Sequence, residues 1–165
     1  MIGKVLDVGI GTGKNIDYYN NEAKVTGIDF SKKMLENAKR KLKKSGRKNI
    51  SLKLMDVENL KFRDNSFDYV ITSSVFCSVP NPIEGLKEIK RVLKPNGKLI
   101  MVEHVLSKNK IIAFFENLFN PMVKFLTGVN INRNTRQNIE KSGIVVKKEK
   151  NLALIDVFRL FVAEK

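Results

Sequence analysis

Short runs of apolar residues alternate along the chain with longer segments in which apolar side chains recur every three or four positions. The runs are typical of buried strands and predict five of them, over residues 2–8, 24–28, 50–54, 67–72 and 98–102. The clearest helical segments begin at Ser31, a favoured N-cap residue, and at Pro82, which suits a first helical turn. Strands and helices that alternate in this order form βαβ units, so we predict a parallel sheet covered by helices on both faces.

The C-terminal third departs from this alternation. Residues 110–128 are apolar and aromatic, whereas residues 132–142 are polar with helix-like spacing. Residues 144–150 and 154–163 are typical of two strands joined by a short turn near Asn151, which predicts an antiparallel hairpin. The predicted fold is therefore α/β, with a doubly wound sheet of seven strands that is mostly parallel and has an antiparallel C-terminal hairpin strand.

The composition indicates one globular domain spanning residues 1–165. The chain is 42% hydrophobic and 29% charged, which argues against disorder. Its single cysteine excludes a disulfide framework and a cysteine-rich zinc site, and it favours a reducing cytosol. No apolar run approaches the roughly 20 residues that a membrane-spanning helix needs, and we expect no signal peptide. We therefore expect a cytoplasmic protein.

The net charge of +14 is the unusual feature of this composition. It suggests an anionic partner, such as nucleic acid or a membrane surface, or a lysine-rich surface without a partner. Ten Lys and Arg residues but a single acid lie between Lys32 and Lys53, on the predicted helix after the second strand and its flanks. No aromatic side chain that could stack on a base is interleaved with them, so we do not expect nucleic acid as the partner.

The turn after the first strand carries the most informative motif, V-L-D-V-G-I-G-T-G over residues 5–13. Its glycines, Gly9, Gly11 and Gly13, allow the backbone to approach a ligand closely. Dinucleotide-binding enzymes have the pattern G-x-G-x-x-G, but here the third glycine comes one residue earlier. Asp7 lies within the motif, and its carboxylate would repel a diphosphate but suit a cationic ligand. Taken alone, the turn is also compatible with a tight strand–helix connection in some other α/β protein.

Two further acids follow strand ends. Asp29 ends the second strand, where a carboxylate can accept hydrogen bonds from both hydroxyls of a ribose. Asp56 ends the third strand, where an adenine edge would lie in the same arrangement. Because open α/β sheets bind ligands in the crevice at the carboxyl ends of their strands, we expect both acids to border one site together with Asp7.

These motifs resemble those of the class I S-adenosylmethionine-dependent methyltransferases over nearly the whole chain. The matching segments are DVGIGTG (7–13), GIDFS (27–31), MDVENL (55–60), FDYVITS (67–73) and LKPNGKL (93–99). Two more segments, FCSV (76–79) and MVEHV (101–105), are similar to the branch that holds ubiquinone and menaquinone biosynthesis methyltransferases and membrane-associated thiol methyltransferase-like proteins. The resemblance implies a Rossmann-like sheet and S-adenosylmethionine as the cofactor.

The resemblance also implies roles for the glycine loop and the acid within it. Gly9, Gly11 and Gly13 would let the loop pass under the methionine part of the cofactor. Asp7 would hold the amino group of the cofactor, directly or through water. Methyl transfer from a sulfonium requires no metal, because the donor is already activated and alignment is the main contribution of the protein.

The other cofactor contacts implied by the resemblance come from the second, third and fourth strands. Asp29 would bind the ribose hydroxyls, and Phe30 would line one face of the adenine. Asp56 would accept a hydrogen bond from the adenine amino group, while the amide of Val57 donates to the ring. The sulfonium would be flanked from the end of the fourth strand by Thr72, Ser73 and Ser74.

Two residues are candidates for chemistry on the acceptor side. His104, the only histidine, ends the fifth strand beside Glu103, and we expect it to face the crevice as a base or as a group that positions the acceptor. It is equally compatible with a hydrogen-bonded histidine at a strand end. Cys77 follows the fourth strand, and we expect it to pack in the core, because methyl transfer needs no covalent enzyme intermediate.

The sequence departs from the family pattern at its start and in residues 108–130. Members of the family carry a helical segment that precedes the first strand and covers the cofactor. Here the strand begins within the first three residues, Met1 to Gly3, so we expect a domain without this cap. Residues 108–130 lie where the family elaborates its acceptor site. Their apolar part is compatible with a pair of core helices, or with an acceptor pocket or membrane-facing lid flanked by Lys108, Lys110 and Lys124.

The sequence thus favours a methyltransferase that acts on a small, apolar acceptor, with peripheral membrane association as an open possibility. Three alternatives remain at this stage. The chain could methylate nucleic acid or protein, or it could be an inactive cofactor-binding module completed by a homodimer mate or another partner chain. A fragment of a nicotinamide-dependent dehydrogenase is disfavoured by the early third glycine, by Asp7 and Asp56, and by the terminal hairpin.

Overall fold

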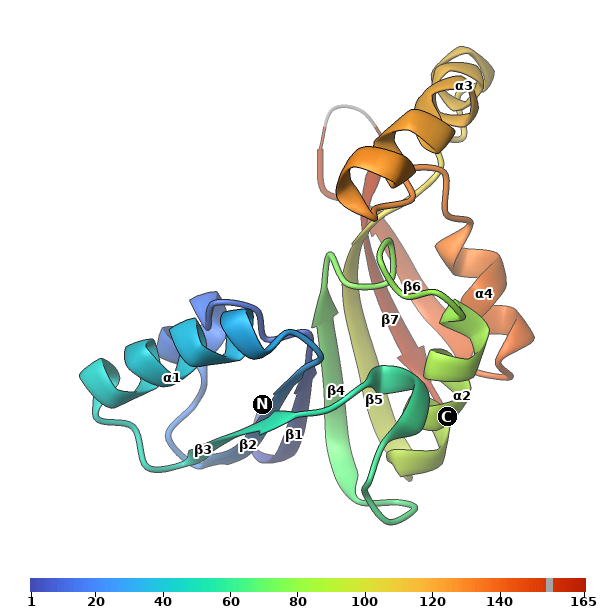
Figure 1. The fold of residues 1–165 in the computed structure, drawn as a ribbon. Coiled ribbons are helices and arrows are strands. Elements are labelled where there is room, and N and C mark those ends of the chain that lie inside the picture. The colour runs from blue at the N-terminus through green and yellow to red at the C-terminus, as the bar shows by residue number, and fades with distance from the viewer. Residues whose placement is uncertain (154–155) are drawn as a thin grey trace.

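One mixed β-sheet organises the computed structural model of this protein, which describes residues 1–153 and 156–165. Within these residues seven strands follow the order β3-β2-β1-β4-β5-β7-β6 (Figure 1). The strands are β1 (Gly3–Val8), β2 (Ala23–Asp29), β3 (Ile50–Leu54), β4 (Phe67–Ser73), β5 (Leu93–His104), β6 (Val145–Asn151) and β7 (Phe158–Glu164). The helices are η1 (Lys14–Tyr18), α1 (Lys32–Ser45), η2 (Val57–Asn59), α2 (Pro82–Val92), α3 (Lys110–Thr127) and α4 (Thr135–Lys141), of which η1 and η2 are short 3₁₀ helices.

The pairing of the strands confirms the predicted α/β fold. Strands β1 to β5 pair in parallel, and β7 is antiparallel to both β5 and β6. The predicted hairpin is therefore present, although β7 begins at Phe158, and the expected start of this strand at Leu154 lies outside the described residues. Strand β5 is longer than predicted because the turn residues Lys94–Gly97 are included in its extended backbone.

Both faces of the sheet are buried, as the sequence predicts. Successive strand residues point to opposite faces, so Val5 packs with Leu35 and Ala38 of α1, whereas Leu6 belongs to the core on the opposite face. That second core includes residues of α2 and α4, which pack against each other there (Figure 1). The layered arrangement leaves the carboxyl ends of β1 to β5 along one edge of the sheet.

The helix boundaries follow from local capping chemistry. The hydroxyl of Ser31 accepts a hydrogen bond from the backbone N–H of Met34, as expected for an N-cap, and α1 ends at Gly46 in a left-handed conformation with φ 68°. Pro82 is the first residue of α2, where its missing N–H has no intrahelical partner to lose. The glycine loop leads into the short 3₁₀ helix η1 rather than into an α-helix.

Residues 110–128 do not form the pair of core helices that was one of the two arrangements expected for this segment. They form one long helix, α3, ending at Gly128, and most of its large apolar side chains are exposed. A pair of core helices is therefore wrong for this segment. The physical reason is that the side of α3 facing the protein carries polar groups: Glu116 is buried, and its carboxylate accepts the backbone N–H of Ser107 at 2.8 Å. Among the described residues, no helix combines the length and the apolar character that crossing a bilayer requires.

Asp7 and Glu103 are the most deeply buried acids among the described strand residues. Asp7 in β1 accepts hydrogen bonds from the hydroxyl of Tyr19 and, at 3.4 Å, from Nδ2 of Asn15. Burial raises the pKa of Asp7 to about 6, against the opposing effect of these hydrogen bonds. Glu103 in β5 is fully buried, and its burial raises the pKa to about 7. Both acids therefore bind protons more tightly in the folded chain than in the unfolded one.

This difference predicts a pH-dependent stability. Stabilisation from a raised acid pKa is complete below the unfolded value, near 4, and is lost as the pH rises through the folded value, here about 6 for Asp7 and about 7 for Glu103. The wild type should therefore lose on the order of 2–3 kcal/mol per group between pH 4 and pH 7, relative to the variants Asp7→Asn and Glu103→Gln. Urea denaturation of the three proteins over this range measures the difference. A difference that grows with pH would contradict the prediction.

Candidate functional site

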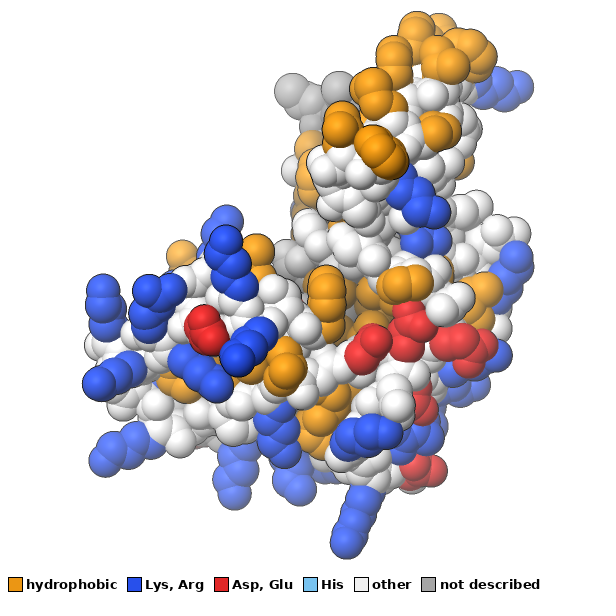
Figure 2. All heavy atoms as spheres, viewed as in Figure 1, with side chains coloured by type: hydrophobic (Ala, Val, Ile, Leu, Met, Phe, Trp, Pro, Cys, Tyr) orange, Lys and Arg blue, Asp and Glu red, His pale blue; other side chains and the backbone are white. Residues whose placement is uncertain are grey.

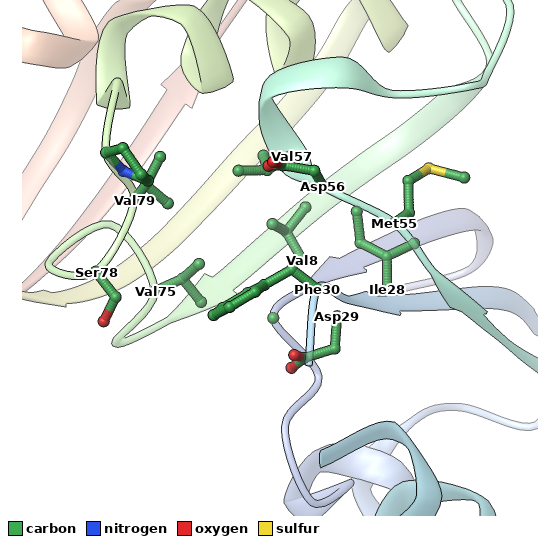
Figure 3. Close-up of a pocket in the computed structure, with 12 residues that line it drawn as sticks. Val8, Ile28, Asp29, Phe30, Met55, Asp56, Val57, Val75, Ser78 and Val79 are labelled. Carbon is green, nitrogen blue, oxygen red and sulfur yellow. The ribbon is translucent and has the colours of Figure 1, made fainter. Parts of the chain in front are cut away.

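A crevice of about 170 Å³, partly open to solvent, lies at the carboxyl ends of β1, β2 and β3 (Figure 3). Its walls are mostly apolar, and two carboxylates, Asp29 and Asp56, interrupt them. The lining residues are Val8, Gly9, Ile28, Asp29, Phe30, Met55, Asp56, Val57, Val75, Ser78, Val79 and Pro80.

Asp29 ends β2 and fixes the geometry of the crevice. One carboxylate oxygen accepts the backbone N–H of Gly11 at 2.9 Å, and the other accepts that of Ser31 at 2.8 Å. The side chain is 7% exposed and still lines the crevice. Because a carboxylate oxygen has two lone pairs, each oxygen keeps acceptor capacity for a ligand hydroxyl. Asp29 is therefore held in place by the protein and remains available to a ligand.

The glycine loop lies against β2 and the segment after β4. The N–H groups of Gly9 and Ile10 both donate to the carbonyl of Ile28, at 2.8 and 2.9 Å. Gly9 has φ 69°, and a Cβ atom there would lie 2.4 Å from Cγ2 of Val75 on the opposite wall. Glycine at this position thus keeps both the left-handed backbone and the space between the two walls.

The other two glycines of the motif have different surroundings. Gly11 is held by Asp29, and a Cβ atom there would meet no close neighbour. Gly13 lies behind the loop. A Cβ atom there would lie 2.6 Å from Cδ1 of Ile16 and 3.2 Å from Cα of Ala38 in α1. Neither of them lines the crevice in the structure, whereas Gly9 does.

Asp7 is placed behind the crevice. Its carboxylate contacts Tyr19 and Asn15, and the residue is 1% exposed. The structure therefore brings Asp29 and Asp56 together on the crevice wall, while Asp7 supports the loop from the interior. The hydrogen bond between Asp7 and Tyr19 joins residues twelve positions apart, so the spacing within the motif gave no sign of it.

The second and third strands supply an aromatic ring and a short helical turn. Phe30 is 76% exposed and projects into the crevice from the end of β2, with Val75 and Val79 on the opposite wall (Figure 3). Asp56 caps η2 by accepting the N–H of Glu58 at 2.9 Å, and its side chain is exposed. Val57, the first residue of η2, is buried beside it. An aromatic ring, an apolar wall and an outward carboxylate therefore frame one end of the crevice.

The end of β4 differs from expectation in the role of Thr72. Its hydroxyl donates to Oε1 of Glu103 at 2.7 Å, and the residue is buried. Ser73 and Ser74 are exposed at the strand end, and Ser74 has φ 56°, so the chain turns sharply there. Of the three residues expected around the sulfonium, the structure leaves the two serines exposed, and it pairs Thr72 with an acid inside the sheet.

Glu103 is a functional candidate that the sequence analysis passed over, naming it only as the neighbour of His104. Its carboxylate accepts the N–H of Val75 at 3.0 Å and the N–H of Phe76 at 3.1 Å, in addition to the hydroxyl of Thr72. These contacts hold the start of the loop that forms one wall of the crevice. The sequence offered one sign of this role: a glutamate lies in an apolar strand segment that is expected to be buried. A buried carboxyl group needs hydrogen-bond partners.

His104 does not line this crevice. Neighbouring strand residues face opposite sides, and the His104 ring packs edge-to-face on Phe158 of β7, with Nε2 4.0 Å from Oε1 of Glu116 in α3. Its Nδ1 is buried without a hydrogen-bond partner among the described residues. Cys77 is buried, as expected for a packing role, and burial raises the pKa of its thiol. In the part of the chain that the structure describes, no group of three or more His, Cys, Asp or Glu side chains is arranged to hold a metal ion.

Comparisons with known proteins agree with this geometry. The family model described as "Methyltransferase domain" matches residues 6–101, which include the second half of β1, the glycine loop and β2 to β4. A phosphatidylethanolamine N-methyltransferase from Cereibacter sphaeroides is 36% identical over 123 residues, covering 70% of this chain and 61% of that protein. A demethylmenaquinone methyltransferase from Staphylococcus epidermidis is 36% identical over 127 residues, covering 74% and 51%. The chain thus spans between half and two thirds of the length of these relatives.

Solved structures share the fold at lower sequence identity. A SAM-dependent methyltransferase from Aquifex aeolicus superposes with a TM-score of 0.71 at 22% identity, covering 97% of this chain and 80% of that one. A [4+2]-cyclase, SpnF, superposes with a TM-score of 0.83 at 18% identity, covering 100% and 76%. At these identities the likeness concerns the fold alone, and the family follows from the matched domain. The chain belongs to the class I S-adenosylmethionine-dependent methyltransferases.

Proposed function

We propose that this protein transfers a methyl group from S-adenosylmethionine to a small, apolar acceptor at the carboxyl edge of the sheet. The observation that carries the proposal is the position and the hydrogen bonding of the Asp29 carboxylate. It lies on the crevice wall with both carboxylate oxygens fixed by backbone N–H groups, at 2.9 and 2.8 Å. An acceptor fixed in this way is suited to the paired hydroxyls of a ribose.

The residues around Asp29 fit the rest of the cofactor. Phe30 and Val57 offer apolar contact to an adenine ring, and Asp56 offers an outward acceptor for its amino group. The space that Gly9 leaves in front of Val75 would be filled by any larger side chain. The site is also acidic within a chain of net charge +14, which favours a ligand with a positive charge.

The chemistry follows from this arrangement. When bound, S-adenosylmethionine supplies a methyl group already activated by its sulfonium, so the transfer is a direct displacement. The chain would contribute alignment: Gly9, Gly11 and Gly13 would shape the loop for the methionine part, and the exposed Ser73 and Ser74 would flank the sulfonium. Asp7, which supports the loop from behind, would hold the amino group of the cofactor, directly or through water. Thr72 acts through Glu103 by fixing the end of β4.

On the acceptor side, we propose that residues 108–130 supply the binding region and that His104 positions the acceptor. The His104 ring lies at the end of β5 and near Glu116 of α3, so it links the sheet edge to this segment. The names of the two relatives above give phosphatidylethanolamine and demethylmenaquinone as their acceptors. Both molecules carry long apolar chains. These names support an apolar acceptor, and we place the action in the cytoplasm at a membrane.

Calorimetry tests the cofactor assignment. We expect S-adenosylmethionine and S-adenosylhomocysteine to bind and NAD not to bind. Asp29→Ala should weaken cofactor binding by about 1–3 kcal/mol, roughly a 5- to 150-fold rise in Kd, because it removes the acceptor for the ribose hydroxyls. Asp29→Asn, which keeps one acceptor oxygen, should lose less.

Asp64→Ala is the matched control for this experiment. Asp64 is an exposed acid that pairs with Arg91 ahead of β4, and it does not line the crevice. Its replacement should leave cofactor affinity unchanged, and circular dichroism should show all three variants folded. Unchanged affinity in Asp29→Ala would overturn the placement of the ribose.

An assay with labelled methyl donor tests the acceptor class. Quinol precursors, phospholipids, thiols and RNA are offered separately to the full chain, and we expect label in one of the small or lipid acceptors. Labelled RNA without turnover of any small acceptor would overturn the proposed acceptor class and favour a nucleic-acid methyltransferase. Cofactor binding without transfer to any acceptor would favour a binding module completed by a partner chain.

A further inference from the structure

Helix α3 presents its apolar side to solvent and its polar side to the protein. At 3.6 residues per turn, its large apolar residues fall on one broad face and its polar residues on the other. The polar side makes hydrogen bonds with the rest of the chain, and Ile112 and Val123 at its border are half-buried. Glu116 accepts the N–H of Ser107 at 2.8 Å, and the side-chain oxygen of Asn120 accepts the N–H of Ile131 at 2.9 Å. This orientation is the reverse of that in an ordinary surface helix, which buries its apolar face.

The outward face is large and continuous. Its most exposed members have between 56% and 88% of their surface accessible. They are Ile111, Phe114, Leu118, Met122, Phe125 and Leu126. In Figure 1 the helix projects beyond the carboxyl edge of the sheet, and Figure 2 shows hydrophobic side chains gathered over it. Exposed apolar surface of this extent marks a site of interaction with another apolar body.

The exposed charges that α3 itself carries beside its apolar face are basic. They are Lys110 and Lys124, and Figure 2 shows basic side chains at this margin, whereas Lys108 before the helix pairs with Glu149 of β6 at 3.1 Å. Between residues 105 and 134 the sole acid is Glu116, which is buried beneath the helix. Basic residues bordering an apolar face are the combination by which amphipathic helices bind anionic lipid surfaces.

The base of α3 is firmly attached to the sheet. The N–H of Lys108 donates to the carboxylate of Asp156 at 2.7 Å, and Asp156 pairs with the buried Arg159 of β7 at the same distance. Arg159 is paired in turn with Glu149 of β6 at 3.0 Å. Because the segment before α3 is anchored in this way, a surface that binds α3 also fixes the orientation of the sheet edge that carries the crevice.

We propose that α3 lies in the plane of an anionic bilayer surface, with its apolar face inserted among the lipids. The inference deepens the proposed function, which places the action at a membrane, by naming the element that binds the surface and the charge of that surface. A second copy of the chain is a poorer occupant of this face. Two copies packed through α3 would bring the lysines of each against those of the other, and no exposed acid in residues 105–134 is present to pair with them.

Co-sedimentation with vesicles tests the proposal, using the full chain without cofactor. Vesicles of phosphatidylcholine that contain about one quarter phosphatidylglycerol are compared with vesicles of phosphatidylcholine alone. We expect binding to the anionic vesicles, and a loss of tenfold or more in the double variant Phe114→Glu with Phe125→Glu. These two rings lie three turns apart on the outward face, and the change places two carboxylates where lipid would contact the helix.

The double variant Ile2→Glu with Val145→Glu is the matched control. Both residues are exposed and apolar, and both lie at the opposite, amino edge of the sheet, so the change in charge is the same. This variant should bind vesicles within about twofold of the wild type, a change that corresponds to less than half a kcal/mol. Equal losses in the two double variants would show that net charge alone governs binding and would overturn the role of α3.

A second pair of substitutions tests the contribution of the flanking charges. Lys110→Gln and Lys124→Gln should each weaken binding to the anionic vesicles by about fivefold and leave binding to neutral vesicles unchanged. Sedimentation velocity resolves the alternative occupant: a wild-type dimer that ignores vesicles and becomes monomeric in the Phe114→Glu, Phe125→Glu variant would overturn the proposal. Since no cofactor is present, failure here is distinct from failure to bind S-adenosylmethionine in the calorimetry.

Discussion

Carboxylates that accept backbone N–H groups hold both walls of the crevice. On one wall, Asp29 binds the N–H of Gly11 in the glycine loop and that of Ser31 at the start of α1. On the other, Glu103 binds the N–H groups of Val75 and Phe76 at the start of the loop after β4. Hydrogen bonds to a charged acceptor are stronger than those between neutral groups, so short polar loops gain a defined shape at the sheet edge.

Burial also leaves ionisable groups in the interior. It raises the pKa of Asp7 to about 6 and that of Glu103 to about 7, because the surroundings of both carboxyl groups disfavour their charged forms. Neither acid lines the crevice, so the pH dependence of stability that they produce arises behind its walls.

Charge and apolar surface are distributed unevenly over the molecule. Two acids, Asp29 and Asp56, line the crevice, and a dense group of basic residues lies on α1 and its flanks. Helix α3 adds an exposed apolar face bordered by lysines on the same side of the sheet as the crevice. The net charge of +14 is thus compatible with a protein whose site faces an anionic surface, and it needs no nucleic-acid partner to explain it.

The sequence by itself determined the succession of strands and helices along the chain, the glycine loop, the Ser31 cap and the positions of Asp29 and Asp56, whereas the order of the strands in the sheet came from the structure. These features depend on local periodicity and on residues that follow one another directly, which a single chain displays. Only the tertiary structure decided the pairing of Thr72 with Glu103, of Asp7 with Tyr19, and the place of His104 away from the crevice. It also decided that α3 turns its polar side inward. The physical reason is that these features depend on contacts between side chains distant in sequence, or on which face of a helix packs against the protein. The local sequence pattern predicts neither of them.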